Sequence, residues 1–544
     1  MWMDEPTEKA LLWHRVWSRF QPSTPMGQQA KGLLSPFMPG EERQWQASLS
    51  EQERIMECRK KRPDWASRVE AHLCRLPDIR PILKRMRRGG TPGVADWFRV
   101  KQFLWEGRAC RRRLAEAGLE RALPGDEGRW EAVLRQLNPE SRLHPSFSLS
   151  DAYDPELADL RNRWSEWDRR FREAGEQQAD NVERDYGIRR NLEGEWVVDR
   201  RFADLPRLQA DPRLRMVRGT PFEWIFQPVQ TEEEKEAGAC RESLQRRLEE
   251  KEAEVLHRLA DRLRAETDFL EQAVREVKRF DLQWARVRAA ETWEGTCPTL
   301  SQGEYRLEGG VHPAVQESLR EEGDGLTPVD IRIRPGATVI IGPNMGGKTL
   351  ALQTLGVVVA LGQYGFLVPA RSLAMPLVPW MAGVIGEGQQ AEAGLSTFGA
   401  EVDRLARLLN RPSSGLLLLD EIGRGTNPVE GAALSAALTC YLAENRHWAV
   451  HVTHYQEVMQ VEGIRAYRVA GLKQDDLPEP GEGEWKRELR SRMDYRLLPW
   501  SEGDEVPREA LGIASLLGLP EEIIESARQS MERAGRDETG NPDY

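Results

Sequence analysis

Eight consecutive residues have the spacing of a loop that binds the phosphates of a nucleotide. They follow the pattern G-x-x-x-x-G-K-T and are Gly342, Pro343, Asn344, Met345, Gly346, Gly347, Lys348 and Thr349. The glycines allow backbone N–H groups to point at phosphate oxygens, while the Lys348 ammonium suits the β- and γ-phosphates and the Thr349 hydroxyl suits Mg²⁺. The octapeptide therefore predicts a site for a nucleoside triphosphate.

Two carboxylates follow an apolar run further along the chain. Residues 416–419 are four leucines, and Asp420 and Glu421 come directly after them. A buried parallel strand would place both carboxylates at its carboxyl end, where Asp420 would hold Mg²⁺ through water and Glu421 would polarise the water that attacks the γ-phosphate. Alone, this pattern is typical of a strand that meets a solvated turn. Together with the phosphate loop, it predicts the catalytic carboxylates.

Three further segments complete the set of candidate site residues. Residues 394–401 form a turn of small residues before a helix, where Ser396 and free N–H groups would bind an anion, with a simple helix cap as the alternative. His454 directly follows the strand-like run 450–453 and is a candidate sensor of the γ-phosphate. A lone histidine at the end of a strand is more often a packing residue without a role in function. Residues 423–426, Gly-Arg-Gly-Thr, are predicted to run along a subunit interface.

The elements around the phosphate loop alternate between strand and helix. Residues 337–341 form a short apolar, β-branched run that is typical of a buried strand, and residues 350–355 have a helix-forming composition. A loop between a strand and a helix is the setting in which this motif binds phosphate. The sequence therefore predicts an α/β nucleotide domain.

In this order and spacing, the segments resemble the MutS family of DNA mismatch-repair ATPases. The resemblance covers roughly residues 298–535 and includes His312-Pro313, near the start of the family's nucleotide domain, and residues 509–524, which resemble its dimerising tail. It implies an ABC-type P-loop ATPase with a parallel-rich sheet, ATP and Mg²⁺ as cofactors, and a dimer that clasps ATP between its subunits. The residues that it implies act in cis are Asn344, Gly347, Lys348, Thr349, Asp420, Glu421 and His454. Ser396 would act in trans, and His312 is a further candidate for nucleotide contact.

The first half, residues 1–297, carries no phosphate motif and is predicted to be mainly helical. No proline lies between Pro228 and Pro298, and apolar residues recur there at spacings of three, four or seven. This predicts one long amphipathic helix of some 55 to 60 residues, on the order of 85 Å. In MutS-like proteins such helices are levers, and residues of about 190–230 are predicted to form a small clamp between two lever arms. An unrelated helical scaffold is the alternative.

Two parts found in longer MutS-like proteins are not recognised in this chain. One is the pair of amino-terminal α/β domains, the first of which carries a Phe-x-Glu wedge, and the other is the nuclease tail of one MutS-related branch. The Phe-x-Glu matches at residues 171–173 and 269–271 fall in predicted helices, where a wedge could not reach a groove. We therefore expect a short form with a helical part at 1–297 and an ATPase part with dimerising helices at 298–544.

Composition sets further bounds. The 544 residues, 40% hydrophobic, suffice for two or three domains. Neither a signal peptide nor a run of about 18 apolar residues is found, so we expect a soluble, cytoplasmic protein without a membrane partner. Six scattered cysteines without C-x-x-C spacing argue against a disulfide framework or a zinc site and are expected to be buried thiols.

Two functions are compatible with the predicted ATPase. In the first, a homodimer, or a heterodimer with a MutS-like paralogue, is a clamp on duplex or branched DNA in repair or recombination. In the second, the dimer remodels a metabolic enzyme, such as a cobalamin-dependent aminomutase. A net charge of −11 does not indicate a polyanion partner, although basic clusters at 59–62 and 84–88 could contact phosphates unless they are solvated faces. The family resemblance narrowly favours DNA.

Overall fold

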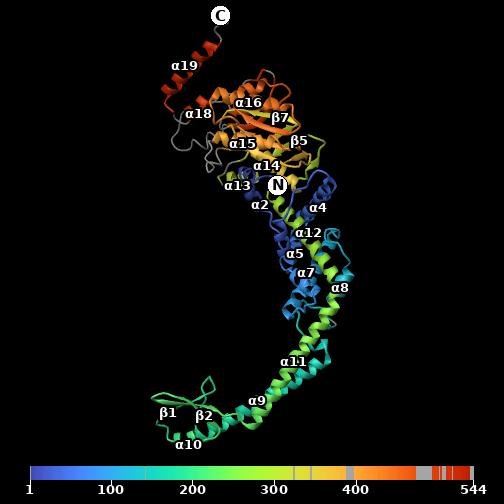
Figure 1. Cartoon of the computed structure of the whole chain (residues 1–544), viewed down its shortest axis with the longest axis vertical. Helices are drawn as coiled ribbons and strands as arrows, with labels where there is room; N and C mark the ends of the chain where they lie inside the picture. The colour runs from blue at the N-terminus through green and yellow to red at the C-terminus, as the bar shows by residue number, and fades with distance from the viewer. Residues whose placement is uncertain are drawn as a thin grey trace. The chain divides into compact units, whose positions relative to one another are not determined.

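The structure is a computed structural model that describes residues 2–140, 142–322, 325–343, 346–386, 397–472, 493–501, 503–504, 510–516 and 519–538. Figure 1 shows the chain coloured by residue number. By its internal contacts the chain divides into two compact units. Unit 1 comprises residues 1–70, 114–122 and 278–544, and unit 2 comprises residues 71–113 and 123–277.

A six-stranded sheet forms the centre of unit 1, in the order β13-β12-β7-β11-β10-β9. Its strands are β7 (Gly336–Ile341), β9 (Met381–Val384), β10 (Leu416–Asp420), β11 (Trp448–Thr453), β12 (Arg465–Leu472) and β13 (Met493–Pro499). All neighbours from β9 to β12 are parallel, and β13 is antiparallel to β12. Parallel strands covered on both faces are apolar throughout, as in β10, whose four leucines are buried. The predicted α/β fold with a parallel-rich sheet is confirmed.

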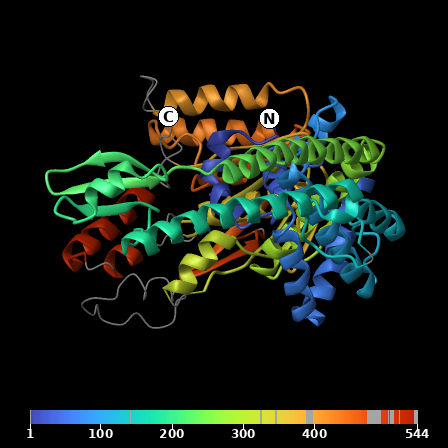
Figure 2. The ribbon, with the colours of Figure 1, turned by 90° about the horizontal axis from the view of Figure 1, so that it is seen from below.

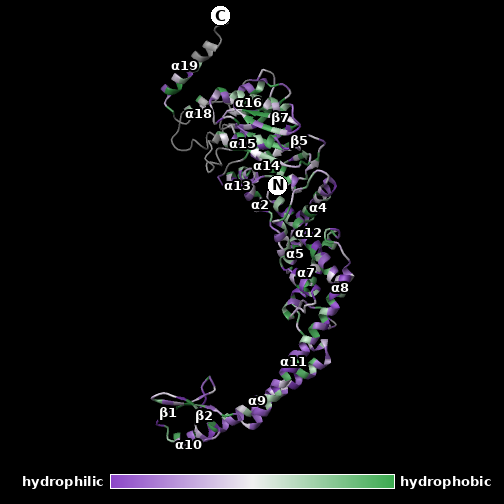
Figure 3. Cartoon of the chain, viewed as in Figure 1, coloured by the Kyte–Doolittle hydropathy of each residue, from purple (hydrophilic) through white to green (hydrophobic). Residues whose placement is uncertain are grey.

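Helices and a smaller sheet accompany this sheet in unit 1. The helices of its carboxyl-terminal part are α13 (Pro313–Glu321), α14 (Lys348–Gln363), α15 (Thr397–Leu409), α16 (Pro428–Ala443), α18 (Ala510–Leu516) and α19 (Glu521–Glu538). The smaller sheet has the order β4-β8-β5-β6, from β4 (Thr299–Leu300), β5 (Tyr305–Gly310), β6 (Val329–Ile333) and β8 (Ser372–Met375). In Figure 3 the β7 region is strongly hydrophobic, as expected for a sheet covered on both faces.

The amino-terminal helices pack in the same unit as the nucleotide domain. They are α1 (Glu5–Ala10), α2 (Trp13–Trp17), α3 (Pro25–Lys31), α4 (Glu42–Lys61) and the start of α5 (Pro63–Cys74), and they are joined by the end of α12 (Thr267–Glu291). The Trp2 indole donates to the Val378 carbonyl at 2.9 Å, for example. The compact units therefore differ from the predicted division at 297/298, because contacts between residues more than 300 positions apart tie the first residues to the ATPase part.

Unit 2 is mainly helical. Its longer helices are α6 (Arg80–Arg87), most of α7 (Val94–Glu116), α8 (Glu127–Gln136), α9 (Pro155–Tyr186), α11 (Glu232–Arg264) and the first part of α12. Helices α9 and α11 lie side by side (Figure 2). Asp154 caps α9 by accepting from the Glu156 N–H at 2.9 Å, and it also forms ion pairs with Lys251 and Arg258 of α11. These contacts fix the two helices against each other at this point.

A small antiparallel sheet is inserted between α9 and α11. It has the order β1-β3-β2, from β1 (Trp196–Asp199), β2 (Leu214–Gly219) and β3 (Glu223–Pro228), with α10 (Leu205–Ala210) between the first two strands. Trp196, Val198 and Phe226 form its buried side together with Leu208 of α10. The sheet lies within the range where the sequence suggests a clamp, and its role as a clamp stays a prediction.

The prediction of one continuous helix between Pro228 and Pro298 is wrong. Helix α11 ends at Arg264 and α12 begins at Thr267. The Glu266 N–H donates to the Leu263 carbonyl at 3.0 Å, a tighter i to i−3 bond, and the Thr267 hydroxyl donates to the Arg264 carbonyl at 2.8 Å. A threonine hydroxyl that takes a backbone carbonyl competes with the helical ladder. No proline or glycine marks this break, so periodicity alone does not reveal it.

The expectation that the cysteines are buried is wrong for two of them. All six are free, Cys110 is buried, and Cys74 and Cys440 are exposed. Both lie on helices, α5 and α16, at positions that face solvent.

Among the described residues, no helix combines the length and the apolar composition needed to cross a membrane.

His451 on β11 predicts a pH-dependent stability. Its side chain is fully buried, and burial lowers its pKa to about 4. The Thr439 hydroxyl donates to the Ser435 carbonyl, so it accepts from Nδ1–H of neutral His451 at 2.8 Å. The unfolded chain, with a histidine pKa near 6.5, binds the extra proton first as the pH falls. The contribution of neutral His451 to the free energy of unfolding is therefore fully present above about pH 6.5. It is lost as the pH falls toward 4, by on the order of 3 kcal/mol.

We expect the thermal midpoint of the His451→Asn variant to fall less between pH 7 and pH 5 than that of the wild type. The exposed His257 on α11 provides the control, because His257→Asn should leave the pH dependence unchanged. An equal fall in wild type and His451→Asn would show that the imidazole is not the titrating group.

Candidate nucleotide site

The phosphate loop lies between the buried strand β7 and helix α14, as the motif requires. Gly347 caps α14 with φ 78°, in the left-handed region that favours glycine. A Cβ atom at Gly347 would also come within 2.7 Å of the Tyr495 ring on β13, so a side chain there would have to displace the tyrosine. Asn344 and Met345, both predicted to contact the nucleotide, lie outside the described residues.

The Lys348 side chain points back over the phosphate loop. Its Nζ donates to the carbonyls of Gly342 and Pro343 at 2.9 and 2.8 Å, and it lies 3.4 Å from Glu421 Oε1. Lys348 is only 4% exposed, and burial lowers its pKa although Glu421 and Asp420 oppose that shift. A buried ammonium that holds loop carbonyls is positioned to take phosphate oxygens as stronger, charged acceptors.

Thr349 and Asp420 form the oxygen pair that Mg²⁺ would use. The Thr349 hydroxyl donates to Asp420 Oδ2 at 2.8 Å, and this bond joins the start of α14 to the end of β10. Asp420 Oδ1 is buried without a hydrogen-bond partner among the described residues, and burial raises the Asp420 pKa. A hydroxyl and a carboxylate with a free oxygen are ligands that suit Mg²⁺, whose charge would favour the ionised carboxylate.

Glu421 lies beside two cationic side chains and one histidine. Its carboxylate is 3.4 Å from Lys348, 3.2 Å from Arg424 and 3.7 Å from His454 Nδ1. His454 makes the largest contribution to lowering the Glu421 pKa to about 2, and Lys348 and Arg424 add to it against the opposing effect of burial. The distance of 3.7 Å between His454 Nδ1 and the Glu421 carboxylate is longer than an ordinary hydrogen bond. Glu421 is therefore ionised at neutral pH.

The backbone holds Glu421 in an unusual conformation. Its φ is 51°, one of three positive values among non-glycine residues of the described chain. The Glu421 N–H donates to the Val452 carbonyl of β11 at 2.8 Å, and its own carbonyl accepts from the Arg424 N–H at 3.2 Å. Backbone strain of this kind clusters at functional sites. Here it turns the carboxylate out of the strand and toward Lys348.

His454 and His312 have different surroundings. His454 follows β11, contacts the Tyr455 ring with the two ring centroids 4.2 Å apart, and faces Glu421. His312 is fully buried at the start of α13, where its Nε2 is 3.1 Å from the Leu11 carbonyl, and burial lowers its pKa to about 4. A side chain without exposed surface would have to move to reach a nucleotide, so the role of His312 in nucleotide contact stays a prediction.

The segment after Glu421 packs against the start of α15. The Gly423 N–H donates to Glu401 of α15 at 2.9 Å, and a Cβ at Gly425 would lie 3.2 Å from that of Phe398. Ser396, predicted to act in trans, lies outside the described residues.

Sequence reasoning did not identify two side chains of this site. They are Arg424 as a partner of Glu421, and Tyr495 opposite Gly347. Arg424 stands three residues after the carboxylate, a visible signal, whereas nothing in the sequence points to Tyr495.

Together the described residues place five of the predicted side chains around one point. Lys348 and Thr349 come from α14, Asp420 and Glu421 from the end of β10, and His454 from the end of β11. The carboxyl ends of adjacent parallel strands are the usual place for a ligand in such sheets.

Comparison with known proteins agrees with this geometry. Residues 338–534 match the family model described as MutS domain V. An Endonuclease MutS2 of Halothermothrix orenii is 33% identical over 294 residues, which make up 53% of this chain and 34% of that protein. A DNA mismatch repair protein MutS of Salinibacter ruber is 28% identical over 298 residues, 53% of this chain and 31% of that protein. The matched region thus spans about a third of the length of these relatives. Residues 338–534 therefore carry a MutS domain V, which supports a relationship of this chain to the MutS family.

Proposed function

We propose that this protein is an ATPase that uses ATP and Mg²⁺ to drive a movement of its helical unit while bound to DNA, in repair or recombination. The observation that carries the proposal is the cluster of Lys348, Thr349, Asp420, Glu421 and His454 at one edge of a parallel sheet. Its presence within a MutS domain V supports ATP as the nucleotide.

Each residue of the site has a separate role in the proposed hydrolysis of ATP. Bound Mg²⁺ would neutralise phosphate charge, held by Thr349 and Asp420. Lys348 would exchange the carbonyls of Gly342 and Pro343 for the β- and γ-phosphates, which removes one of the cations that keep the Glu421 pKa low. Glu421 then becomes a better acceptor for a proton of the attacking water. His454 faces Glu421 and would respond to the γ-phosphate.

We propose a dimer, in which Ser396 of one subunit acts on the nucleotide of the other. The partner is a second copy or a MutS-like paralogue, and the carboxyl-terminal helices α18 and α19 contribute to the contact. Ile523 on α19 is 51% exposed and Met531 is 46% exposed, which is the apolar surface that a helical contact needs. We place the protein in the cytoplasm.

We favour DNA as the binding partner because the names of the relatives refer to DNA mismatch repair and to an endonuclease. The small inserted sheet supports this choice. Its exposed arginines are Arg200, Arg201, Arg215 and Arg218. Arginine side chains on an exposed sheet suit contacts with phosphate oxygens, which fix position without reading sequence. We propose that this sheet is the clamp and that α9 and α11 are the levers.

DNA binding provides the test. We expect the protein to bind duplex or junction DNA with an affinity that changes with ATP and that falls with salt, with a log–log slope of several units. The double variant Arg201→Ala, Arg215→Ala should reduce that slope by about one to two. Arg135→Ala on α8, an exposed arginine paired with Glu131, is the control. Absence of binding at low salt, together with ATPase stimulation by a metabolic enzyme, would favour the protein-remodelling function instead.

A further inference from the structure

The first residues of the chain follow the helix that begins at the phosphate loop. Residues 2–31, which we call the amino-terminal strap, contact α14 at Gln353, whose amide donates to the Ala10 carbonyl at 2.8 Å. A Cβ at Gly356, one turn later, would lie 2.7 Å from the Leu11 side chain. Directly after α14, the Tyr364 ring is surrounded by three indoles of the strap: Trp2, Trp13 and Trp17. The strap therefore contacts α14 from its middle to its end.

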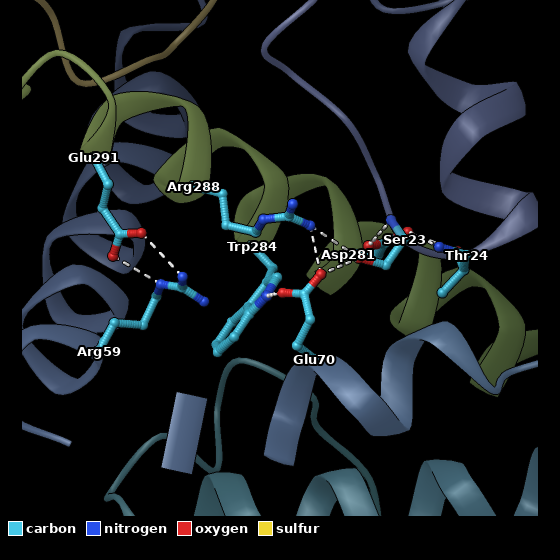
Figure 4. A network of polar contacts seen from close by, with 8 residues as sticks. All are labelled: Ser23, Thr24, Arg59, Glu70, Asp281, Trp284, Arg288 and Glu291. Carbon is cyan, nitrogen blue, oxygen red and sulfur yellow. Dashed lines mark hydrogen bonds and ion pairs between the residues drawn. The ribbon is translucent and has the colours of Figure 1, made fainter. Parts of the chain in front are cut away.

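The other end of the strap is bound to α12 through Asp281. Figure 4 shows the Asp281 carboxylate pointing at residues 23 and 24. It accepts from the N–H groups of Ser23 and Thr24, both at 2.9 Å, and from the Thr24 hydroxyl at 2.7 Å. Asp281 is fully buried, and burial raises its pKa although these hydrogen bonds oppose the shift. Three donors therefore depend on one buried carboxylate, and each would be left unpaired without it.

Further polar contacts fix the same face of α12. Glu70 accepts from the Ser23 hydroxyl at 2.8 Å and from the Trp284 indole at 2.5 Å, and it also pairs with Arg288 (Figure 4). Arg59 pairs with Glu291 at 2.8 Å and stacks on Trp284 at 4.4 Å. The α12 residues in this network are spaced three or four positions apart and so lie on one face. These partly buried polar contacts join α12 to the residues around 23 and 70, and satisfied networks of this kind stiffen the elements that they join.

We propose that the amino-terminal strap transmits the state of the nucleotide site to α12, and that Asp281 is the positioning residue that joins the strap to this helix. The proposal rests on the proposed function, since it requires a nucleotide at the start of α14. Helix α12 belongs by its contacts to unit 2 up to Val277 and to unit 1 from Lys278 onward. A displacement of its second half would therefore be passed along a single helix into the unit that carries the predicted levers.

A direct contact between α12 and the residues after α14 is the competing path. The Arg286 guanidinium lies 5.4 Å from the centre of the Phe366 ring, and the Trp293 indole donates to the Leu367 carbonyl at 3.0 Å. If these contacts alone carried the signal, breaking the contact between the strap and Asp281 would have no effect. The two paths can therefore be separated by substitution.

Two variants break the contact between strap and helix from opposite sides. In Asp281→Asn, one amide oxygen replaces a carboxylate that accepts from three donors. In Gly27→Ala, the new methyl group on α3 would overlap the Asp281 carboxylate without changing Asp281 itself. Each has a matched control: Asp268→Asn changes an exposed aspartate on the same helix α12, and Gly32→Ala adds a methyl group at the end of α3, where the nearest atom is 3.7 Å away.

The measurement is hydrogen–deuterium exchange of the full chain with and without ATP and Mg²⁺. We expect nucleotide to change the exchange rates of residues 278–291 by about fivefold or more in the wild type and in both controls. In Asp281→Asn and Gly27→Ala this change should fall below about twofold while ATP still binds with wild-type affinity. A merely structural role of Asp281 would alter exchange without nucleotide and leave the response to nucleotide intact.

Three results would overturn the proposal. One is an unchanged effect of ATP on the exchange rates of residues 278–291 in either variant. That result would mean that the direct contacts of Arg286 and Trp293 with residues 366 and 367 carry the signal. Another is a wild type that binds ATP without any change at residues 278–291, a result that does not depend on how the variants fold. The third is loss of ATP binding in both variants. A wild type that binds no ATP at all would instead reject the proposed function, so the two failures are distinguishable.

Discussion

Replacing Lys348 with alanine is expected to lower the turnover number for ATP hydrolysis by at least about a hundredfold, because the ammonium is the only described lysine within ion-pair distance of Glu421. The side chain is buried and lies over the phosphate loop, so after it exchanges the loop carbonyls for phosphate oxygens it can stabilise the charge that develops on the phosphates. Alanine would also leave the carbonyls of Gly342 and Pro343 without the donor that they have now. Steady-state hydrolysis and ATP binding by calorimetry measure the two effects.

Lys61→Ala is the matched control for this prediction. Lys61 lies on α4, is 69% exposed, and forms only an exposed pair with Glu57. Exposed pairs of this kind contribute little, so hydrolysis by Lys61→Ala should equal that of the wild type. Hydrolysis by Lys348→Ala at a near wild-type rate would contradict the assignment of the phosphate loop.

The clustering of the candidate nucleotide-site residues was predictable because local sequence fixes their places on strands and helices. Lys348 and Thr349 follow a buried strand and begin a helix, and Asp420 and Glu421 end another strand, so a parallel sheet brings them together without further information. The bond of 2.8 Å between Thr349 and Asp420 is the clearest case. The positive φ of Glu421 has no sequence signal, because glutamate rarely adopts it and only the surrounding strands impose it.

The packing of the amino-terminal residues could not be predicted in the same way. Trp2 donates to Val378 and His312 contacts Leu11, pairs that are 376 and 301 positions apart. Single-sequence periodicity predicts a helix and its apolar face, but it does not say which distant element covers that face. The same limit explains the break at residues 265–266, where one threonine hydroxyl ends a pattern that otherwise continues.

Replacing Glu421 with glutamine is expected to reduce hydrolysis by about a hundredfold or more while ATP stays bound, so that the proposed dimer accumulates in its ATP-bound form. Glutamine keeps the size of the side chain but removes the charge that pairs with Lys348, Arg424 and His454. The charges of Lys348 and Arg424 would then be less compensated and would attract the γ-phosphate more strongly. Loss of the water-orienting carboxylate and tighter ATP binding therefore act in the same direction.

Single-turnover hydrolysis, retention of labelled ATP and the mass of the complex in solution measure this outcome. Glu462→Gln is the control, because Glu462 is an exposed glutamate in the turn before β12. Since His454 contributes most to the low Glu421 pKa, His454→Ala should raise that pKa toward its ordinary value. Hydrolysis by His454→Ala should then weaken at a higher pH than in the wild type as the solution is acidified. Rapid hydrolysis by Glu421→Gln would mean that another group orients the attacking water.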